Sequence, residues 1–235
     1  MHASALRPPT SRFAATTGGR GRGSRGPRRV APWCCGGAAW LSAGCAAAYT
    51  AVLTPAAPQA VYLQVGVGSF TANYDVGGQP QNNTTINDET VSVAATAVGN
   101  GAAQAMTTNS TQTKSYWDGF TYCTVPGQLY IGGFYRTTGA ATAAAQVTAS
   151  VPAVLTDATG DTISFATIAW TSSGIADTGA EPFPSATFIA GGLQNVGSMA
   201  SNTWNESCWA FTYSNKTTPP AGTYTGRVTY TMSSP

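Results

Sequence analysis

Residues Gln146-Val147-Thr148-Ala149-Ser150-Val151 alternate polar and apolar side chains, and Pro152 ends the run. A period of two places one set of side chains on a buried face and the other set in water, which is the pattern of a β-strand. The preceding residues 140–145 are rich in alanine and could begin a short helix, because alanine has the highest helix propensity. The alternation that follows favours a strand that leads into 146–151.

The same alternation recurs in short runs from Val61 onward, whereas helical periodicity is nearly absent. The pattern predicts an all-β fold, an immunoglobulin-like antiparallel β-sandwich of about 7 to 9 strands. The predicted strands are 61–73, 85–98, 120–125, 128–135, 145–155, 162–171, 185–191, 208–213 and 223–232. Turn-forming residues separate them at 75–80, 99–101, 157–161, 172–184, 191–197 and 215–222.

Charge divides the chain into two parts. The first 60 residues hold seven arginines and no acidic residue. The whole chain has 11 basic and 9 acidic residues, so the part from Val61 onward has 4 basic and 9 acidic residues and a net charge of −5. The basic character of the full sequence therefore belongs to its N-terminal region. The arginines are Arg7, Arg12, Arg20, Arg22, Arg25, Arg28 and Arg29.

The N-terminal region resembles a secretory signal in its layout. Arginines precede an apolar, small-residue run at 30–60, as a charged n-region precedes the core of a signal peptide. An Arg/Gly arm at 18–29 could instead bind nucleic acid, but export explains both the charge and the apolar run. We therefore expect an N-terminal extension and signal segment at 1–60, a single β-sandwich domain at 61–235, and no nucleic-acid partner.

Cleavage after Ala56, Ala57 or Ala60 would suit the small-residue preference of signal processing. Residues 42–45 resemble a lipoprotein box without its usual aliphatic residue, so a lipid anchor at Cys45 is the less favoured alternative. The run at 30–60 contains too few strongly apolar residues to hold a helix in lipid. We expect no stable membrane span in the exported part.

Five cysteines occur, and three of them, Cys34, Cys35 and Cys45, lie in the predicted targeting region. The remaining pair, Cys123 and Cys208, is predicted to form one disulfide in an exported domain. A closed zinc site is the weaker interpretation, because two cysteines without a nearby histidine supply too few ligands.

The only histidine is His2, so the exported part has no imidazole for a Ser-His-Asp or Cys-His mechanism. A pair of carboxylates could still hydrolyse a glycosidic bond, but the acidic residues form no recognisable motif. Asp157 and Asp161 flank a glycine and could offer oxygen ligands to calcium, although a hairpin turn explains them better. We predict a protein that is not an enzyme and has no cofactor or metal.

Aromatic residues cluster at 116–122 and 204–211, beside the two cysteines. Rings flanked by polar groups can stack on a sugar and bind its hydroxyls, which makes Trp117, Asp118, Trp204 and Trp209 candidate ligand-binding residues. The alternative is structural, because a tryptophan packed on a disulfide is common in sandwich cores.

The C-terminal run 221–235 reads AGTYTGRVTYTMSSP, with one face made by alternating apolar residues. It resembles the closing strand of chaperone-usher pilins and of spore-coat-protein-U-like secreted proteins. In pilins a glycine stands fourteenth from the C-terminus, the position of Gly222, whereas their usual penultimate tyrosine is replaced here by Ser234. By this resemblance the assembly strand comprises Gly222, Tyr224, Val228 and Tyr230.

The resemblance implies an incomplete sandwich that a strand from a periplasmic chaperone or a neighbouring subunit completes. Residues 61–67 alternate as a donor strand would, and also as an ordinary first strand would. The expected function is a non-catalytic cell-surface or fimbrial subunit, secreted, periplasmic or surface-bound, that assembles with identical or related subunits. The alternatives are a carbohydrate-binding or adhesin module and a carboxylate-based glycan hydrolase.

Overall fold

The computed structural model describes residues 50–139, 143–174 and 181–235. They belong to one compact unit of the chain. The seven arginines of the N-terminal region, His2, Cys34, Cys35, Cys45 and residues 140–142 lie outside the described residues.

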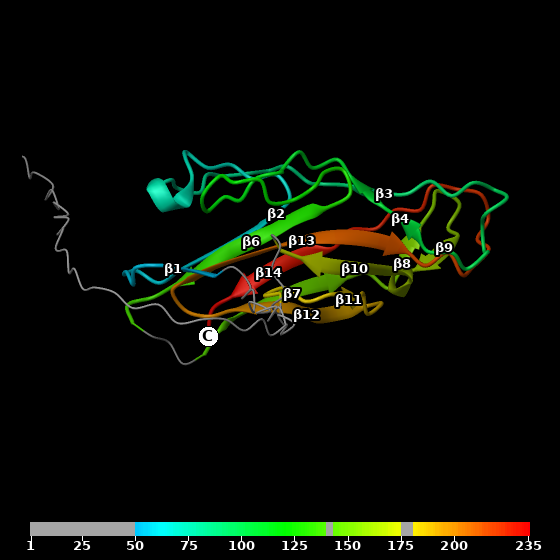
Figure 1. Cartoon of the computed structure of the whole chain (residues 1–235). Helices are drawn as coiled ribbons and strands as arrows, with labels where there is room; N and C mark the ends of the chain where they lie inside the picture. The colour runs from blue at the N-terminus through cyan, green and yellow to red at the C-terminus, as the bar shows by residue number, and fades with distance from the viewer. Residues whose placement is uncertain (1–49, 140–142, 175–180) are drawn as a thin grey trace, which may run out of the picture. The chain divides into compact units, whose positions relative to one another are not determined.

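The described chain is built from short strands in antiparallel sheets, which confirms the all-β prediction (Figure 1). Its helical segments are the 3-10 turns η1 (Tyr74–Val76) and η2 (Phe165–Thr167). There are more strands than predicted, because several of the alternating runs are divided by turns.

Strand β13 (Thr203–Tyr213) is the centre of the larger sheet. One of its edges pairs with β6 (Leu129–Arg136) and then with β4 (Gln104–Ala105). The other edge pairs with β1 (Thr50–Val52) and then with β10 (Ile168–Ser173). Two segments placed end to end therefore cover each edge of the 11-residue strand. The sheet continues outward through β2 (Ala60–Val65) on β6 and β11 (Ala186–Thr187) on β10.

The second sheet has the order β12 (Gly192–Met199), β7 (Ala145–Val151) and β14 (Thr229–Ser233). Two small ribbons join β3 (Glu89–Thr90) to β5 (Thr107–Thr108), and β8 (Val154–Thr156) to β9 (Thr162–Ser164). The main core lies between the two larger sheets. Its members from β13 are Trp209, Phe211 and Tyr213, and those from β7 are Ala145, Val147, Ala149 and Val151.

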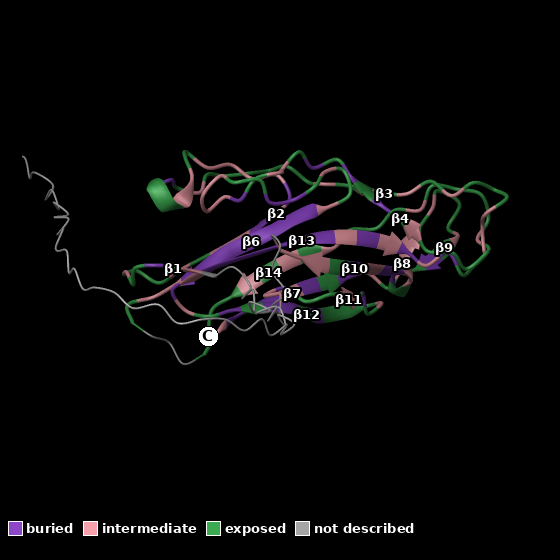
Figure 2. Cartoon of the chain, in the orientation of Figure 1, coloured by how far each residue is buried: buried purple, intermediate pink, exposed green. Residues whose placement is uncertain are grey.

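The opposite face of β13 is also buried (Figure 2). Trp204 and Cys208 project from that face into two smaller clusters, which the long connection between β2 and β6 supplies with Phe70, Tyr116 and Tyr122. Both faces of the large sheet are therefore covered, one by the second sheet and one by loops. This second, loop-covered face is called the outer face below.

Several strand boundaries differ from the prediction. Residues 191–197 were expected to form a turn because of their glycines, but most of them belong to β12, where Val196 is a core residue. Gly197 stands at a bulge, and a Cβ there would lie 2.6 Å from the Phe183 ring, so the glycine permits close packing. Residues 85–98 contain only the two-residue β3, and 120–125 contain no strand.

The domain also begins earlier than residue 61. Strand β1 pairs with β13, and the following Leu53 is 4% exposed in the cluster that contains Phe134 and Trp204. The backbone N–H of Leu53 donates to the carbonyl of Asn202 at 2.8 Å. The last part of the predicted signal segment thus contributes a strand and a core residue, and cleavage after Ala56 would remove both. No helix among the described residues is long and apolar enough to cross a membrane.

Candidate functional site

The C-terminal segment has the two different faces that its alternation predicts. Tyr224, Val228, Tyr230 and Met232 pack against the main core, while the threonines between them are exposed. Only Thr229–Ser233 forms a strand, paired with β7 in the register Tyr230 to Ala149 and Met232 to Val147. Upstream, Thr225 and Thr156 exchange backbone hydrogen bonds of 2.9 and 3.0 Å. Gly222 is exposed beside Asp157.

The side of the core along β14 is less covered than its centre. The inward residues of β7 are at most 3% exposed, but those of β14, Tyr230 and Met232, are only partly buried. Strand β2, at the edge of the other sheet, lies against β14, and its inward Val61 is 42% exposed. Within the described residues β14 pairs only with β7. An apolar row therefore borders an unpaired strand edge.

A carboxyl group with a raised pKa lies beside this strand. Burial, opposed by a hydrogen bond with Thr108 and aided by the nearby charge of Asp88, raises the pKa of Glu89 in β3 to about 7. Glu89 Oε1 is buried and accepts no hydrogen bond from the described residues. Burial raises the pKa of Tyr230, and the charge of the Glu89 carboxylate raises it further. The two side chains therefore lie close enough to interact.

Residues 61–67 are part of this domain's own sheet. Strand β2 pairs along its length with β6, from Ala60 opposite Arg136 to Val65 opposite Ile131. Leu63 and Val65 pack against the main core. In this structure the segment therefore forms an ordinary strand of the chain's own sheet, which is the second of the two alternatives that its alternation allowed.

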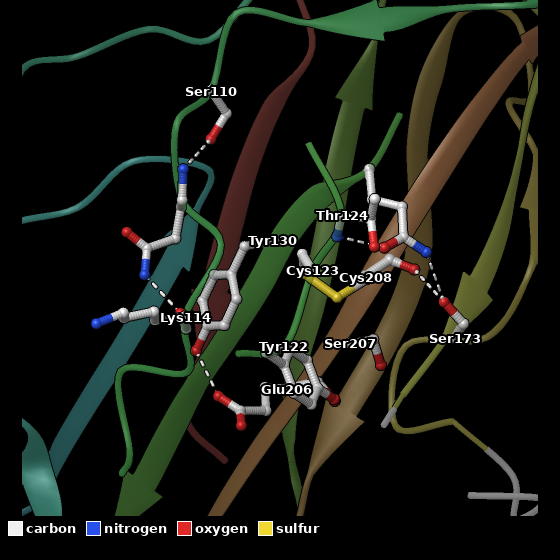
Figure 3. The surroundings of a disulfide bond; sticks show 12 residues. Ser110, Lys114, Tyr122, Cys123, Thr124, Tyr130, Ser173, Glu206, Ser207 and Cys208 are labelled. Atoms are coloured by element: carbon white, nitrogen blue, oxygen red, sulfur yellow. Dashed lines mark hydrogen bonds between the residues drawn. A yellow bond between two sulfur atoms is a disulfide. The ribbon is translucent and has the colours of Figure 1, made fainter. Parts of the chain in front are cut away.

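Cys123 and Cys208 form a disulfide with a Cα–Cα distance of 5.5 Å, as predicted (Figure 3). It attaches the connection before β6 to the outer face of β13, and its cysteines are 2% and 1% exposed. The expected tryptophan on the disulfide is absent from its cluster. Trp209 projects from the other face of β13, and the rings that accompany the disulfide are Tyr122, Tyr130 and Tyr116.

A buried carboxyl group lies next to this cluster. Glu206 is 1% exposed, and its Oε2 accepts hydrogen bonds from the Tyr130 hydroxyl at 2.8 Å and from Trp204 Nε1 at 3.0 Å. Figure 3 shows the Tyr130 hydroxyl directed at this carboxyl. Burial raises the pKa of Glu206, although Trp204, Ser115 and Tyr130 oppose the shift by favouring the charged form. The Tyr122 hydroxyl donates to the Glu206 backbone carbonyl at 2.7 Å.

The structure separates the four candidate ligand-binding residues. Trp204 and Trp209 are both 0% exposed and lie on opposite faces of β13, so neither can stack on a ligand. Their assignment as ligand-binding residues is therefore wrong, because alternation along a strand whose two faces are covered buries both rings. Asp118 Oδ1 accepts a hydrogen bond from the Phe120 backbone N–H in a local turn. Of the four candidates, Trp117 is the one that is partly exposed and also lines a pocket.

That pocket has a volume of about 220 Å³ and is lined by Trp117, Tyr74, Asp75, Arg136 and residues 52–54. Arg136 Nη1 donates to the Tyr74 hydroxyl at 3.0 Å, and the guanidinium carbon lies 5.9 Å from the Phe134 ring centre. A second pocket of about 340 Å³ lies between residues 68–73 and 112–116.

The acidic residues do not assemble a hydrolytic pair in either pocket, since one holds Asp75 alone and the other holds no carboxylate. Asp157 Oδ1 accepts from the backbone N–H groups of Thr159 and Asp161, at 3.0 and 2.8 Å, which makes the predicted hairpin turn between β8 and β9. Among the described residues no group of three or more histidine, cysteine or acidic side chains is placed to hold a metal ion.

Comparison with protein-family models, with curated proteins and with solved structures found no match to this chain. Two residues of interest, Glu89 and Arg136, were not selected from the sequence. Glu206 stands between two of the aromatic residues of 204–211, where alternation on a buried strand could have indicated its burial. Nothing near Glu89 or Arg136 in the sequence marks them, because their partners come from distant segments.

Proposed function

We propose that this protein is an exported, non-catalytic structural subunit of a cell surface or fimbria, and that it assembles by pairing the free edge of β14 with a strand of another protein. The partner is an identical or related subunit, or a periplasmic chaperone before assembly. The proposal extends the resemblance of the C-terminal strand to pilins, with one change. The strand that is donated is not 61–67 of this chain.

The observation that carries the proposal is the incomplete cover of the core along β14. Tyr230 and Met232 remain partly exposed beside an edge without a partner in the described residues, whereas the same core is sealed along β7. Backbone groups on such an edge can bind an extended segment, and the apolar row beside it can take alternate side chains. An added strand would bury this apolar row and form hydrogen bonds with the backbone N–H and C=O groups at the edge of β14.

The buried disulfide supports export, because disulfides persist in oxidising compartments. The low number of charged residues and the many exposed threonines suit a secreted surface protein. For the hydrolase alternative, the two pockets offer no facing carboxylates. We therefore place a structural role above a hydrolytic one.

The test is a comparison of two lysine substitutions at the opposite edges of the same sheet. Thr231→Lys places a charge on the exposed face of β14, and Ser198→Lys does the same on β12. We expect Thr231→Lys to abolish multimers and chaperone complexes in sedimentation and cross-linking, while its monomer keeps the unfolding midpoint of the unsubstituted protein. Ser198→Lys should assemble normally.

Hydrogen exchange gives a second readout. On assembly, the backbone amides of 229–233 should gain protection and those of 192–199 should not. If both lysine variants assemble equally, or if protection is gained only at β12, then β14 is not the edge through which the protein assembles.

A further inference from the structure

We infer that the pocket formed by Trp117, Tyr74, Asp75 and Arg136 is a binding site for a neutral pyranose sugar. The site lies on the outer face of the large sheet, whereas β14 belongs to the second sheet. Its function is therefore independent of strand assembly.

The aromatic wall is set in place by packing beneath it. Tyr74 and Trp117 have ring centres 5.9 Å apart, and each also contacts the fully buried Trp204, at 5.2 and 6.0 Å. Backbone hydrogen bonds of 3.0 Å from Tyr74 to Tyr116 and from Asp75 to Trp117 join the two segments. The Trp117 ring is only partly buried, so an open surface remains for the apolar face of a sugar.

Arg136 supplies hydrogen-bond donors that the fold does not fully use. Its Nη1 donates to the Tyr74 hydroxyl, and its Nε is buried with no hydrogen-bond partner among the described residues. The end of β6 and the Phe134 ring hold the stem in place. Because Arg136 lines the pocket, the accessible N–H groups of its guanidinium can donate to a ligand oxygen there.

The charges favour a neutral ligand. Asp75 is exposed at the rim of the pocket and can accept hydroxyl protons, while Arg136 can donate to hydroxyl or ring oxygens. One carboxylate and one guanidinium leave the pocket without net charge. The chain from Val61 onward has a net charge of −5, which repels anionic ligands.

The size of the pocket limits the ligand to a small unit. Its volume of about 220 Å³ is below the roughly 300–1,000 Å³ that is usual for small-molecule sites. A single pyranose ring, either a free glycoside or the end of a glycan, fits this space better than an internal stretch of several sugars.

The test is saturation-transfer NMR and calorimetry on the full chain with methyl glycosides of glucose, galactose and mannose, and with glucuronic acid as the charged comparison. We expect saturable binding of at least one neutral glycoside, and weaker or no binding of glucuronic acid. Asp75→Asn and Trp117→Ala should each reduce the affinity at least tenfold, as should Arg136→Gln. Arg227→Gln, a matched loss of charge at an exposed position of the C-terminal segment, should leave it unchanged.

Asp75 is exposed, so its variant tests the site without a risk to folding. Failure of all three neutral glycosides to bind, binding that survives Asp75→Asn and Trp117→Ala, or a preference for glucuronic acid would each overturn the inference. These results leave the β14 proposal unaffected, because the assembly assay with Thr231→Lys does not involve this pocket.

Discussion

The Tyr130 hydroxyl donates a 2.8 Å hydrogen bond to Glu206 Oε2 across two neighbouring strands, and both side chains are buried. Trp204 Nε1 shares the same acceptor. Glu206→Ala would leave two buried donors without a partner, each at a cost of about 1–3 kcal/mol. We expect this variant to lose about 2–5 kcal/mol of unfolding free energy, measured by urea denaturation.

Glu206→Gln should behave differently, because its amide oxygen can still accept both hydrogen bonds. Burial raises the pKa of Glu206, so the folded protein keeps its proton above the pH at which the unfolded chain loses it. The contribution of this residue to stability therefore falls as pH rises above its ordinary pKa. The glutamine variant should lack this decline and be at least as stable as the glutamate protein at pH 7.5. A loss as large as that of Glu206→Ala would contradict this account.

Glu89 should make stability depend on pH between about 4.5 and 7. Its pKa rises from 4.5 to about 7 on folding, so the folded state binds more protons in this window and the unfolding free energy falls as pH increases. The full shift corresponds to at most about 3 kcal/mol, and partial exposure reduces it. Glu89→Gln should flatten the profile over this range, measured by urea denaturation at half-unit steps. Asp88→Asn, an exposed neighbour, is the control and should retain most of the slope.

Removal of the disulfide should destabilise the domain by about 4–5 kcal/mol on the chain-entropy model, since the cysteines are 85 residues apart. The measurement is chemical denaturation of the Cys123→Ser/Cys208→Ser variant beside the oxidised protein. Because both cysteines are buried, reductant should act on the native protein only after it unfolds. Rapid reduction or thiol labelling of folded protein would show that the bond is accessible or not formed.

The two faces of the C-terminal strand should respond oppositely to charge. Tyr230→Asp forfeits burial against Trp209, whose ring centre lies 5.8 Å away, and places an unpaired charge at the core. We expect a loss of at least about 2 kcal/mol and poor secretion. Thr229→Lys, one residue earlier on the exposed face, should keep the unfolding free energy of the unsubstituted protein. Equal damage from both would mean that the exposed face is covered in the native protein.

The N-terminal strand provides a prediction about processing. Leu53 is buried against Phe134 and Trp204, so Leu53→Ala should cost about 2–5 kcal/mol, and a chain that begins at Val61 should lose at least as much. Thermal unfolding of both, with Val52→Ala as the exposed neighbour, measures this. Intact mass of the exported protein then determines whether β1 is retained.

Alternation was a reliable guide wherever a strand has one face on the core. It identified β7, β6 and the two faces of 223–232. The pairing of Cys123 with Cys208 was predicted in another way, because they are the two cysteines outside the predicted targeting region. It failed at β12, where glycines that allow a bulge and close packing look like turn residues. It also failed for Trp204, because the cover over the outer face of β13 comes from loops that no local pattern reveals. Trp209 projects from the other face and is buried in the main core between the two sheets.

The ligand-binding features were less accessible to sequence reasoning. Trp117 was selected, but its neighbours in the pocket are Tyr74, about forty residues earlier, and Arg136 at the end of another strand. A tertiary arrangement of this kind leaves no spacing rule in the chain. The partly buried Glu89 and the buried Glu206 are likewise recognised only by what surrounds them.

The position of β13 has a consequence for how the chain can fold. All its partners, β1, β4, β6 and β10, precede it in the sequence, and each contacts it directly. Until residues 203–213 leave the ribosome, those strands have no common template, and their edges and apolar faces stay open to other chains. Long-range pairing of this kind makes folding slow. Only β14 follows β13 in the sequence, so the larger sheet can form around its central strand only when synthesis of the chain is nearly complete.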